Sequence, residues 1–428
     1  MRKATMKAIR QLTVPLCLLL LPAGLQAQAE DAAWKRHMEA ASTALQVNNP
    51  EDALFALGNA LREAERFGPG DPRLGSTLGI MASFQRSQGN FVEAASMYLR
   101  AVSVRERRLG EDHPEVADAL DTLATLYQEE HALHQDDHTQ QDDHTHQDDQ
   151  RLKSAETILQ RALEIREKAY GMDHPSVDAS VIRLAVVYGA QGKYDEAEAL
   201  LRRSLETRER VLGEEGPEVA ASLYNLGIHL HKQGNLAEAE TMLKRSWQLR
   251  EKHFGLLDME LDRSLNALAS IYTEQGRYDE AEELLMLSLA IRENKLGRNH
   301  SGLVPVLGGL SAVHALQDHP VEVQQLLERS IALEEKTLGE EHPFLAPTLN
   351  NLALAHMAQK HYDEAGRIWE RLLSIQESTS GRNHLSLIET LNGLAEAYQK
   401  QGKAQQALPL LRRVESIMEI SDHDATHR

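Results

Sequence analysis

Cysteine is almost absent from this 428-residue chain, which holds one, Cys17. It lies in an apolar N-terminal segment, so the rest of the chain can form neither a disulfide nor a thiol-based catalytic site. Aromatic residues make up only 4% of the sequence, no basic tract follows the N-terminal segment, and the formal charge is −19. Nucleic acids are bound through basic surfaces and stacking aromatics, so we expect no nucleic-acid partner.

The chain has one long apolar run, and it lies near the N-terminus. Four basic residues between Arg2 and Arg10 precede an apolar segment at residues 12–25, and small residues follow at residues 27–29. This order is typical of a secretory signal peptide, which we place at residues 1–27. Prolines interrupt the run, which is shorter than the roughly 20 residues that span a bilayer, so an uncleaved anchor is the less favoured alternative. Cleavage would take the formal charge from −19 to −23 and leave a periplasmic or secreted protein without a membrane span.

The sequence is rich in self-similarity. The phrase Leu-Gly-Glu-Asp-His-Pro at residues 109–114 returns, with changes, at residues 170–175 and 338–343. Its glycine recurs every 42 residues, except for one gap of 61, at Gly68, Gly110, Gly171, Gly213, Gly255, Gly297, Gly339 and Gly381. A fixed period of this length indicates stacked supersecondary units, each in contact with its neighbours. Such a stack offers a long surface for a partner rather than one catalytic cleft.

Each unit contains two predicted helices. Within residues 175–213, apolar and small residues recur at helical spacing over residues 176–191 and again over residues 194–211. Pro175 suits the first turn of the first helix, where a missing N–H costs nothing, and a glycine follows each helix. Small residues such as Ala185 let the two helices approach closely. A single hairpin cannot bury its apolar face alone, so stacking must complete the core.

The combination of motifs resembles a known family. In order, a unit contains Leu-x-x-Leu-Ala-x-x-Tyr, Gln-Gly-x-Tyr-x-Glu-Ala-Glu, Leu-x-Arg-Ser/Ala-Leu-x-x-Arg-Glu and Leu-Gly-x-x-His-Pro. It is similar to the tetratricopeptide repeat, and in particular to the 42-residue variant of kinesin light chains and many bacterial proteins. The resemblance covers residues 68–418, about eight units, with a capping helix pair expected at residues 30–67 and a tail at residues 419–428. It implies an all-α, right-handed superhelical solenoid of antiparallel helix pairs.

The resemblance also implies a function. In this family the first helix of each unit lines the concave face, so we expect a non-catalytic scaffold that binds a protein or an extended peptide segment there. Asparagine suits a peptide groove, because its amide can both donate to and accept from an extended backbone. Hydrogen bonding between repeats is the alternative role for these side chains. The candidate contacts lie three residues before the alanine of the Leu-x-x-Leu-Ala-x-x-Tyr motif, or before the residue that replaces it. They are Asp121, Tyr224, Asn266, Asn350 and Asn392.

The sequence contains no recognisable catalytic motif. A Gly-rich phosphate loop, a His-Glu-x-x-His pair and a serine elbow are all missing. Acidic pairs such as Asp195-Glu196 recur in the first turn of the second helix, where carboxylates interact favourably with the helix dipole. We therefore expect neither an enzyme nor a bound cofactor. The motor-subunit role of light chains is not implied either, because of the predicted secretion signal. A purely architectural part of an envelope assembly remains an alternative.

The gap of 61 comes from a 19-residue insert at residues 131–149, between the two helices of one unit. Its histidines and aspartates could bind a divalent transition metal weakly, so a metal-sequestering or metal-sensing protein is the alternative function. However, nothing fixes a coordination geometry, and a duplicated hexamer within the insert favours a solvated loop over residues 132–149. The candidate metal ligands are His131, His134, His138, His144 and His146.

The sixth unit departs most from the repeat. Gly308 and Gly309 replace the usual Asn-Asn or its equivalent, and Pro305 falls beyond the first turn of the first helix. Pro347 repeats that phase in the next unit. A proline there lacks a donor and clashes with the preceding turn, so these two helices should begin late or kink.

Histidine recurs just before the first helix of several units. Adjacent copies lie one repeat apart, too far to share a metal ion, so we expect them to cap or pack against the start of that helix. They are His113, His174, His300, His342 and His384.

Overall fold

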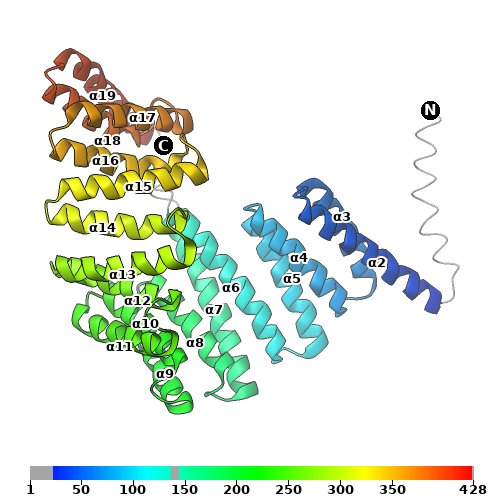
Figure 1. Cartoon of the computed structure of the whole chain (residues 1–428). Helices are drawn as coiled ribbons and strands as arrows, with labels where there is room; N and C mark the ends of the chain where they lie inside the picture. Colours follow the sequence, from blue (N-terminus) through cyan, green and yellow to red (C-terminus); the bar gives the residue numbers. More distant parts are fainter. Residues whose placement is uncertain (1–22, 136–143, 427–428) are drawn as a thin grey trace, which may run out of the picture. The chain divides into compact units, whose positions relative to one another are not determined.

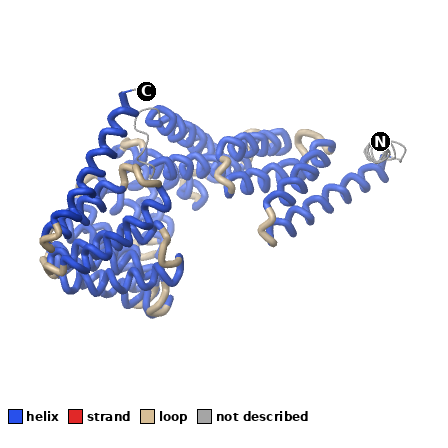
Figure 2. Tube along the Cα trace, turned by 90° about the horizontal axis from the view of Figure 1, so that it is seen from above, coloured by secondary structure: helices blue, strands red, loops and turns tan. Residues whose placement is uncertain are grey.

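The computed structural model describes residues 23–135 and 144–426. These residues form eighteen α-helices and two short 3₁₀ helices, and no strand occurs among them (Figure 2). The α-helices pair in chain order as nine hairpins. We call the first helix of each pair the A helix and the second the B helix. The predicted all-α repeat architecture is confirmed.

The chain divides into two compact units, residues 1–211 and residues 212–428. Four hairpins belong to the N-terminal unit, and the last helix ends at the boundary. They are α2 (Ala23–Gln46) with α3 (Pro50–Arg66), α4 (Pro72–Ser87) with α5 (Phe91–Leu109), α6 (Pro114–Gln135) with α7 (His144–Tyr170), and α8 (Pro175–Ala190) with α9 (Tyr194–Leu212).

Five hairpins form the C-terminal unit, where Figure 1 shows the helices stacked in chain order. They are α10 (Pro217–Lys232) with α11 (Leu236–Phe254), α12 (Met259–Glu274) with α13 (Tyr278–Leu296), α14 (Val304–Leu316) with α15 (Pro320–Leu338), α16 (Ala346–Ala358) with α17 (Tyr362–Ser380), and α18 (Leu387–Lys400) with α19 (Ala404–Thr426). The 3₁₀ helices η1 (Ser301–Leu303) and η2 (Pro343–Leu345) precede α14 and α16.

The histidines before the A helices act as caps, as predicted. Nδ1 of His300 accepts a hydrogen bond from the backbone N–H of Gly302 at 2.9 Å. This bond satisfies one of the N–H groups that a helix start leaves without a partner. The same bond, to the N–H two residues on and at 3.2 Å, is made by His113, His174, His342 and His384.

The prolines of two A helices have the predicted effect. Helix α12 has 16 residues, whereas α14 and α16 have 13 each. Pro305 and Pro347 occupy the second positions of these shortened helices, and a 3₁₀ turn takes the place of the missing α-helical turn. Because proline cannot donate a backbone hydrogen bond, the helix begins where none is needed from it.

The insert and the tail differ from expectation. Helix α6 continues to Gln135 and α7 already begins at His144, so the expected loop over residues 132–149 is wrong at both ends. Glu130 and Arg151 form an ion pair at 3.0 Å that joins the two extended helices. Helix α19 likewise runs through most of the expected tail at residues 419–428, because no proline or glycine interrupts it there.

The predicted leader lies mostly outside the described residues. Helix α2 begins at Ala23, within the segment that we assigned to the signal peptide. Among the helices of the described ranges, none combines the length and the apolar character that crossing a bilayer requires.

Small residues set the distance between the helices of a hairpin. Ala185 and Ala197 are buried between α8 and α9. In the next hairpin, a Cβ atom added to Gly227 would lie only 2.7 Å from Cγ of Leu243. Any larger residue would therefore push the two helices apart.

Candidate functional site

Most of the side chains predicted to contact a partner have partners within the fold. Asp121 is 5% exposed and pairs with two arginines, Arg166 at 2.7 Å and Arg183. The ring of Tyr224 lies 5.1 Å from the guanidinium of the buried Arg250. These two residues stabilise the packing of helices.

Two of the three asparagines also have partners within the fold, and the third is exposed. The amide of Asn350 donates to Glu389 of the next hairpin at 2.8 Å, and its oxygen accepts from the indole of Trp369 at 2.8 Å. Asn266 is bound within its own hairpin, as described below, whereas Asn392 is exposed. The structure therefore favours packing within and between repeats for Asn266 and Asn350, and it leaves Asn392 as a candidate contact.

The α12–α13 hairpin contains a closed polar network. The carboxylate of Asp262, 4% exposed, accepts from the hydroxyl of Ser288 at 2.5 Å and from the guanidinium of Arg292 at 2.7 and 3.0 Å. The amide of Asn266 donates to the same carboxylate at 3.1 Å and to Oγ of Ser288 at 3.0 Å. Buried polar groups are stable only when paired, and here each finds a partner.

The α14–α15 hairpin, 42 residues further on, has lost this network. Val304 stands where Asp262 stood, Gly308 where Asn266 stood, and Glu334 where Arg292 stood. Only the serine is retained, as Ser330, which is 1% exposed. Among the described residues, its Oγ has no hydrogen-bond partner, and neither has the buried Oε2 of Glu334. Both orphan atoms can accept a hydrogen bond.

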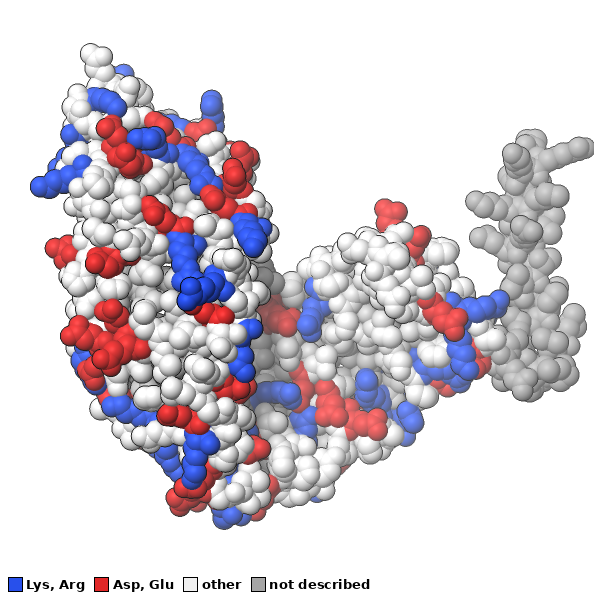
Figure 3. Space-filling model, in the orientation of Figure 1, with Lys and Arg blue, Asp and Glu red and all other residues white. Residues whose placement is uncertain are grey.

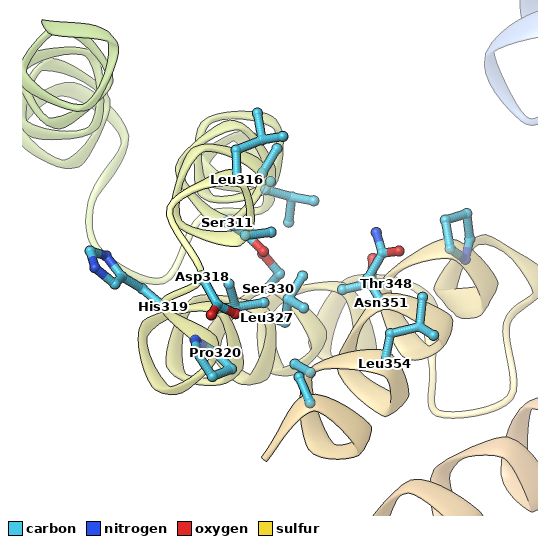
Figure 4. Close-up of a pocket in the computed structure, with 18 residues that line it drawn as sticks. Ser311, Leu316, Asp318, His319, Pro320, Leu327, Ser330, Thr348, Asn351 and Leu354 are labelled. Atoms are coloured by element: carbon cyan, nitrogen blue, oxygen red, sulfur yellow. The ribbon is translucent and has the colours of Figure 1, made fainter. Parts of the chain in front are cut away.

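A pocket of about 560 Å³ occupies the vacated space. Figure 4 shows its lining side chains on α14, α15 and α16. Leu316 and Leu354 are half-exposed parts of the lining, and Ser330 lies among them. A Cβ atom added to Gly308 would meet nothing within 4 Å, so the missing side chain accounts for part of the opening.

The hairpin turn widens the same pocket. Its lining includes Asp318, His319 and Pro320. The α12–α13 turn carries Gly276, Arg277 and Tyr278 at these positions. Two large side chains are thus replaced by smaller rings in the α14–α15 turn, which leaves more of the groove open.

The electrostatics of the pocket differ from those of the closed network. No lysine or arginine occurs among the residues that line it, whereas Asp318 does. One helical turn beyond Ser330, burial raises the pKa of Glu334, although a hydrogen bond with Thr348 partly opposes the shift. Thr348 itself lines the pocket. The pocket is therefore largely apolar, with a carboxylate and no lysine or arginine in its lining.

The N-terminal unit has a pocket of another kind. It has a volume of about 400 Å³ and is lined by Arg86, Arg166 and Arg183 with Asp118 and Asp121. Arg166 lies 2.6 Å from Asp118. The charges are largely paired with one another, so this pocket resembles a structural ion-pair network more than a vacant site.

The metal site stays a prediction. The structure describes the His131 side chain, but those of His134, His138, His144 and His146 lie outside the described residues. Within the described part of the chain, no group of three or more potential ligands is close enough to hold a metal ion.

The sequence contained a signal for the pocket that our prediction did not use fully. Besides Gly308 and the prolines, Val304 and Glu334 depart from the repeat in the same hairpin. When several positions that contact one another all lose their usual partners, the residue that is retained, here Ser330, has nothing left to bind.

The family assignment follows from the sequence comparison. The family described as Tetratricopeptide repeat matches residues 73–135, 178–252, 260–336 and 344–420, and a second match of the same description covers residues 144–176. No curated protein sequence matches the chain.

Solved structures with similar folds include three of interest. Nearly identical TPR-like repeats from a Podosopora anserina protein assigned to the kinesin light chains share 29% identity and cover 49% of this chain and 99% of that chain, with a TM-score of 0.45. The apo form of RapI is 12% identical over 91% of this chain and 98% of its own, with a TM-score of 0.51. A Pyrococcus horikoshii signal transduction ATPase with a tetratricopeptide repeat sensor is 12% identical over 92% of this chain and 54% of its own, with a TM-score of 0.56.

The last two likenesses concern the fold, in agreement with the stacked hairpins. The family match extends over well over half of the residues, and the helix pairs recur with the predicted period. The chain belongs to the tetratricopeptide repeat family.

Proposed function

We propose that the protein is a non-catalytic scaffold that binds an extended segment of a partner protein on the A-helix face of its C-terminal unit. We define this face as the exposed surface of α10, α12, α14, α16 and α18. The pocket between α14, α15 and α16 is the observation that carries the proposal. It combines exposed apolar rim residues with a buried unpaired hydroxyl, as ligand sites commonly do.

Surface charge supports a protein partner. Figure 3 shows Lys and Arg side chains interspersed with Asp and Glu on the face in view. The net charge of −19 opposes binding to nucleic acid or anionic lipid. We further propose that the protein acts in the periplasm or outside the cell, on the basis of the predicted signal peptide alone. Fractionation of cells that express the full chain, with N-terminal sequencing of the product, tests that location.

Site-specific photo-cross-linking tests the binding face. A benzoylphenylalanine at position 354 replaces Leu354, which is 50% exposed at the pocket. The matched control replaces Met286, which is 53% exposed on the B helix α13. We expect a cross-linked partner from periplasmic extract at position 354 and not at position 286. Equal cross-linking at both positions, or none at position 354, would contradict the proposed face.

A further inference from the structure

The α14–α15 hairpin lacks hydrogen-bond donors that its neighbour supplies. In α12–α13, Arg292 and Asn266 bring a cation and an amide to the interior of the hairpin. In α14–α15 their positions hold Glu334 and Gly308, so both donors are gone. Two acceptors remain on α15, Ser330 Oγ and Glu334 Oε2, without partners among the described residues. An unsatisfied buried polar atom destabilises the fold, so a ligand that supplies the missing donor gains free energy on binding.

We propose that the pocket between α14, α15 and α16 binds a lysine side chain of an extended partner segment. Its ammonium donates to Ser330 Oγ and is attracted by the Glu334 carboxylate one turn further along α15. Its methylene stem lies against Leu316 and Leu354. The inference rests on the proposed function for the source of that side chain, which is a protein segment.

Charge complementarity selects a basic side chain over the other classes. An ionised carboxylate accepts hydrogen bonds and cannot donate them, so the unpaired Oε2 of Glu334 calls for a donor. The pocket lining contributes the carboxylate of Asp318 and contains no lysine or arginine. A glutamate or aspartate from the partner would meet like charge. The chain as a whole also attracts basic segments, with a net charge of −19.

The shape of the pocket favours lysine in particular. Its apolar walls suit the flexible aliphatic stem of lysine, whose charge is confined to the end. Arginine would bring a planar fork of donors, which is suited to the two oxygens of one carboxylate. It is less suited to the hydroxyl of Ser330 and the carboxylate of Glu334, which lie one helical turn apart on α15. A norleucine side chain would fill the walls equally but leave both acceptors unpaired.

The test uses the full chain with isotope-labelled leucine and valine methyl groups and four capped pentapeptides, Ala-Ser-X-Ser-Ala. The central residue X is lysine, glutamine, norleucine or glutamate. We expect the lysine peptide to shift the methyl signals of Leu316, Leu327 and Leu354 and to bind at least five-fold more tightly than the others. Equal binding of the lysine and norleucine peptides would overturn the proposal. So would tighter binding of the glutamine or glutamate peptide, or unchanged pocket signals with all four.

Variants then assign the contact. Ser330→Ala and Glu334→Gln should each weaken binding of the lysine peptide about ten-fold, the loss expected for one charge-assisted interaction. Binding of the norleucine peptide should not change. Ser330→Ala removes an unpaired hydroxyl, so it should fold at least as well as the parent. If neither variant changes binding of the lysine peptide, the assignment is wrong.

Gly308→Asn closes the pocket from within. Its amide should reach Ser330 as that of Asn266 reaches Ser288, and lysine-peptide binding should fall at least ten-fold. The matched control is Gly79→Asn at the same repeat position of α4, where an added Cβ also meets nothing within 4 Å. The control should bind as the parent does, and equal losses in the two variants would contradict the assignment.

The outcomes separate this inference from the proposed function. A partner that cross-links through position 354 but ignores the Ser330 and Glu334 variants would overturn the lysine assignment and leave the binding face standing. A lysine peptide that binds in the pocket, with no protein cross-linked from position 354, would support the pocket chemistry and overturn the proposed function.

Discussion

Two neighbouring hairpins of the C-terminal unit, α12–α13 and α14–α15, have the same helix-pair architecture but differ in the side chains of their interiors. In α12–α13, the buried carboxylate of Asp262 holds a guanidinium, a hydroxyl and an amide. In α14–α15, the equivalent positions keep the serine, and the space becomes a pocket of about 560 Å³. Since each hairpin needs only its neighbours, one copy can lose its internal polar contacts while the stack stays intact. Loss of side chains from one repeat is therefore a route to a pocket in the stack.

The turns of the two hairpins differ in the same direction. Glu240 of α11 accepts from Lys244 at 2.6 Å and from Arg277 at 3.0 Å, and Arg277 also stacks on Tyr272 at 3.9 Å. Burial acts to raise the pKa of Glu240, but these hydrogen bonds outweigh it and lower the pKa to about 2. In the α14–α15 hairpin, His319 takes the place of Arg277 and His314 that of Tyr272. Nε2 of His314 lies 3.7 Å from Glu282, the equivalent of Glu240. The polar contact between the α14–α15 hairpin and the preceding hairpin is therefore weaker than that between α12–α13 and α10–α11.

Removal of the central carboxylate should have the largest effect. Asp262→Ala leaves Arg292, Ser288 and Asn266 without their shared acceptor, so we expect a loss of about 3 kcal/mol in the free energy of unfolding. Val304→Ala at the equivalent position removes only two methyl groups and should cost about 1 kcal/mol. Urea unfolding of each variant, followed by hydrogen exchange of the α12–α13 amides, measures the difference. Equal losses would show that the network adds nothing to the hairpin.

Overpacking of the hairpin seam should have the next largest effect. Ala281 of α13 is fully buried, and the equivalent residue of α15 is Val323. Ala281→Leu should cost about 1–3 kcal/mol, because the extra methylenes have no space. Val323→Leu adds one carbon beside an open pocket and should cost less than about 1 kcal/mol. Hydrogen exchange should locate the damage near α12 and α13, and a uniform loss of protection throughout the unit would contradict the repeat picture.

The sequence predicts the backbone better than the roles of polar side chains. Periodicity placed the α8 and α9 bounds within one residue, and proline chemistry predicted the late starts of α14 and α16. Whether an asparagine faces a groove or a neighbour depends on what the adjoining helix offers. Asn350 meets Glu389 and Trp369, and no rule of phase within one unit specifies those partners. For the same reason the pocket was not predicted, because its signal is a set of coupled departures at residues distant in sequence.

The two equivalent serines should respond differently to the same substitution. Ser288→Ala removes a partner of Asp262 and Asn266 and should cost about 1–2 kcal/mol, because buried polar groups lose a hydrogen bond. Ser330→Ala removes an unpaired hydroxyl and should be neutral or slightly stabilising. Thermal melts of the two variants provide the measurement. A loss for Ser330→Ala equal to that of Ser288→Ala would mean that the Ser330 hydroxyl has a partner in solution, such as a bound water.

The smallest expected effect is a dependence of stability on pH that only the open hairpin should show. Burial raises the pKa of Glu334 above its ordinary value of 4.5, so the folded state holds this proton more tightly than the unfolded state. Its contribution to stability is therefore fully present below 4.5 and is lost as pH rises through the raised pKa. The α12–α13 hairpin has an arginine, and so no carboxyl group, at the equivalent position. His356 of α16 acts in the opposite sense, because burial lowers its pKa and stability is lost as pH falls below 6.5.

We expect the difference in unfolding free energy between the parent and Glu334→Gln to change steadily from pH 4 to 7, with the parent losing stability relative to the variant. A difference that stays constant over this range would show that Glu334 is hydrated in the folded protein. Glu334 would then no longer count as one of the two unpaired acceptors that distinguish α14–α15 from its neighbour.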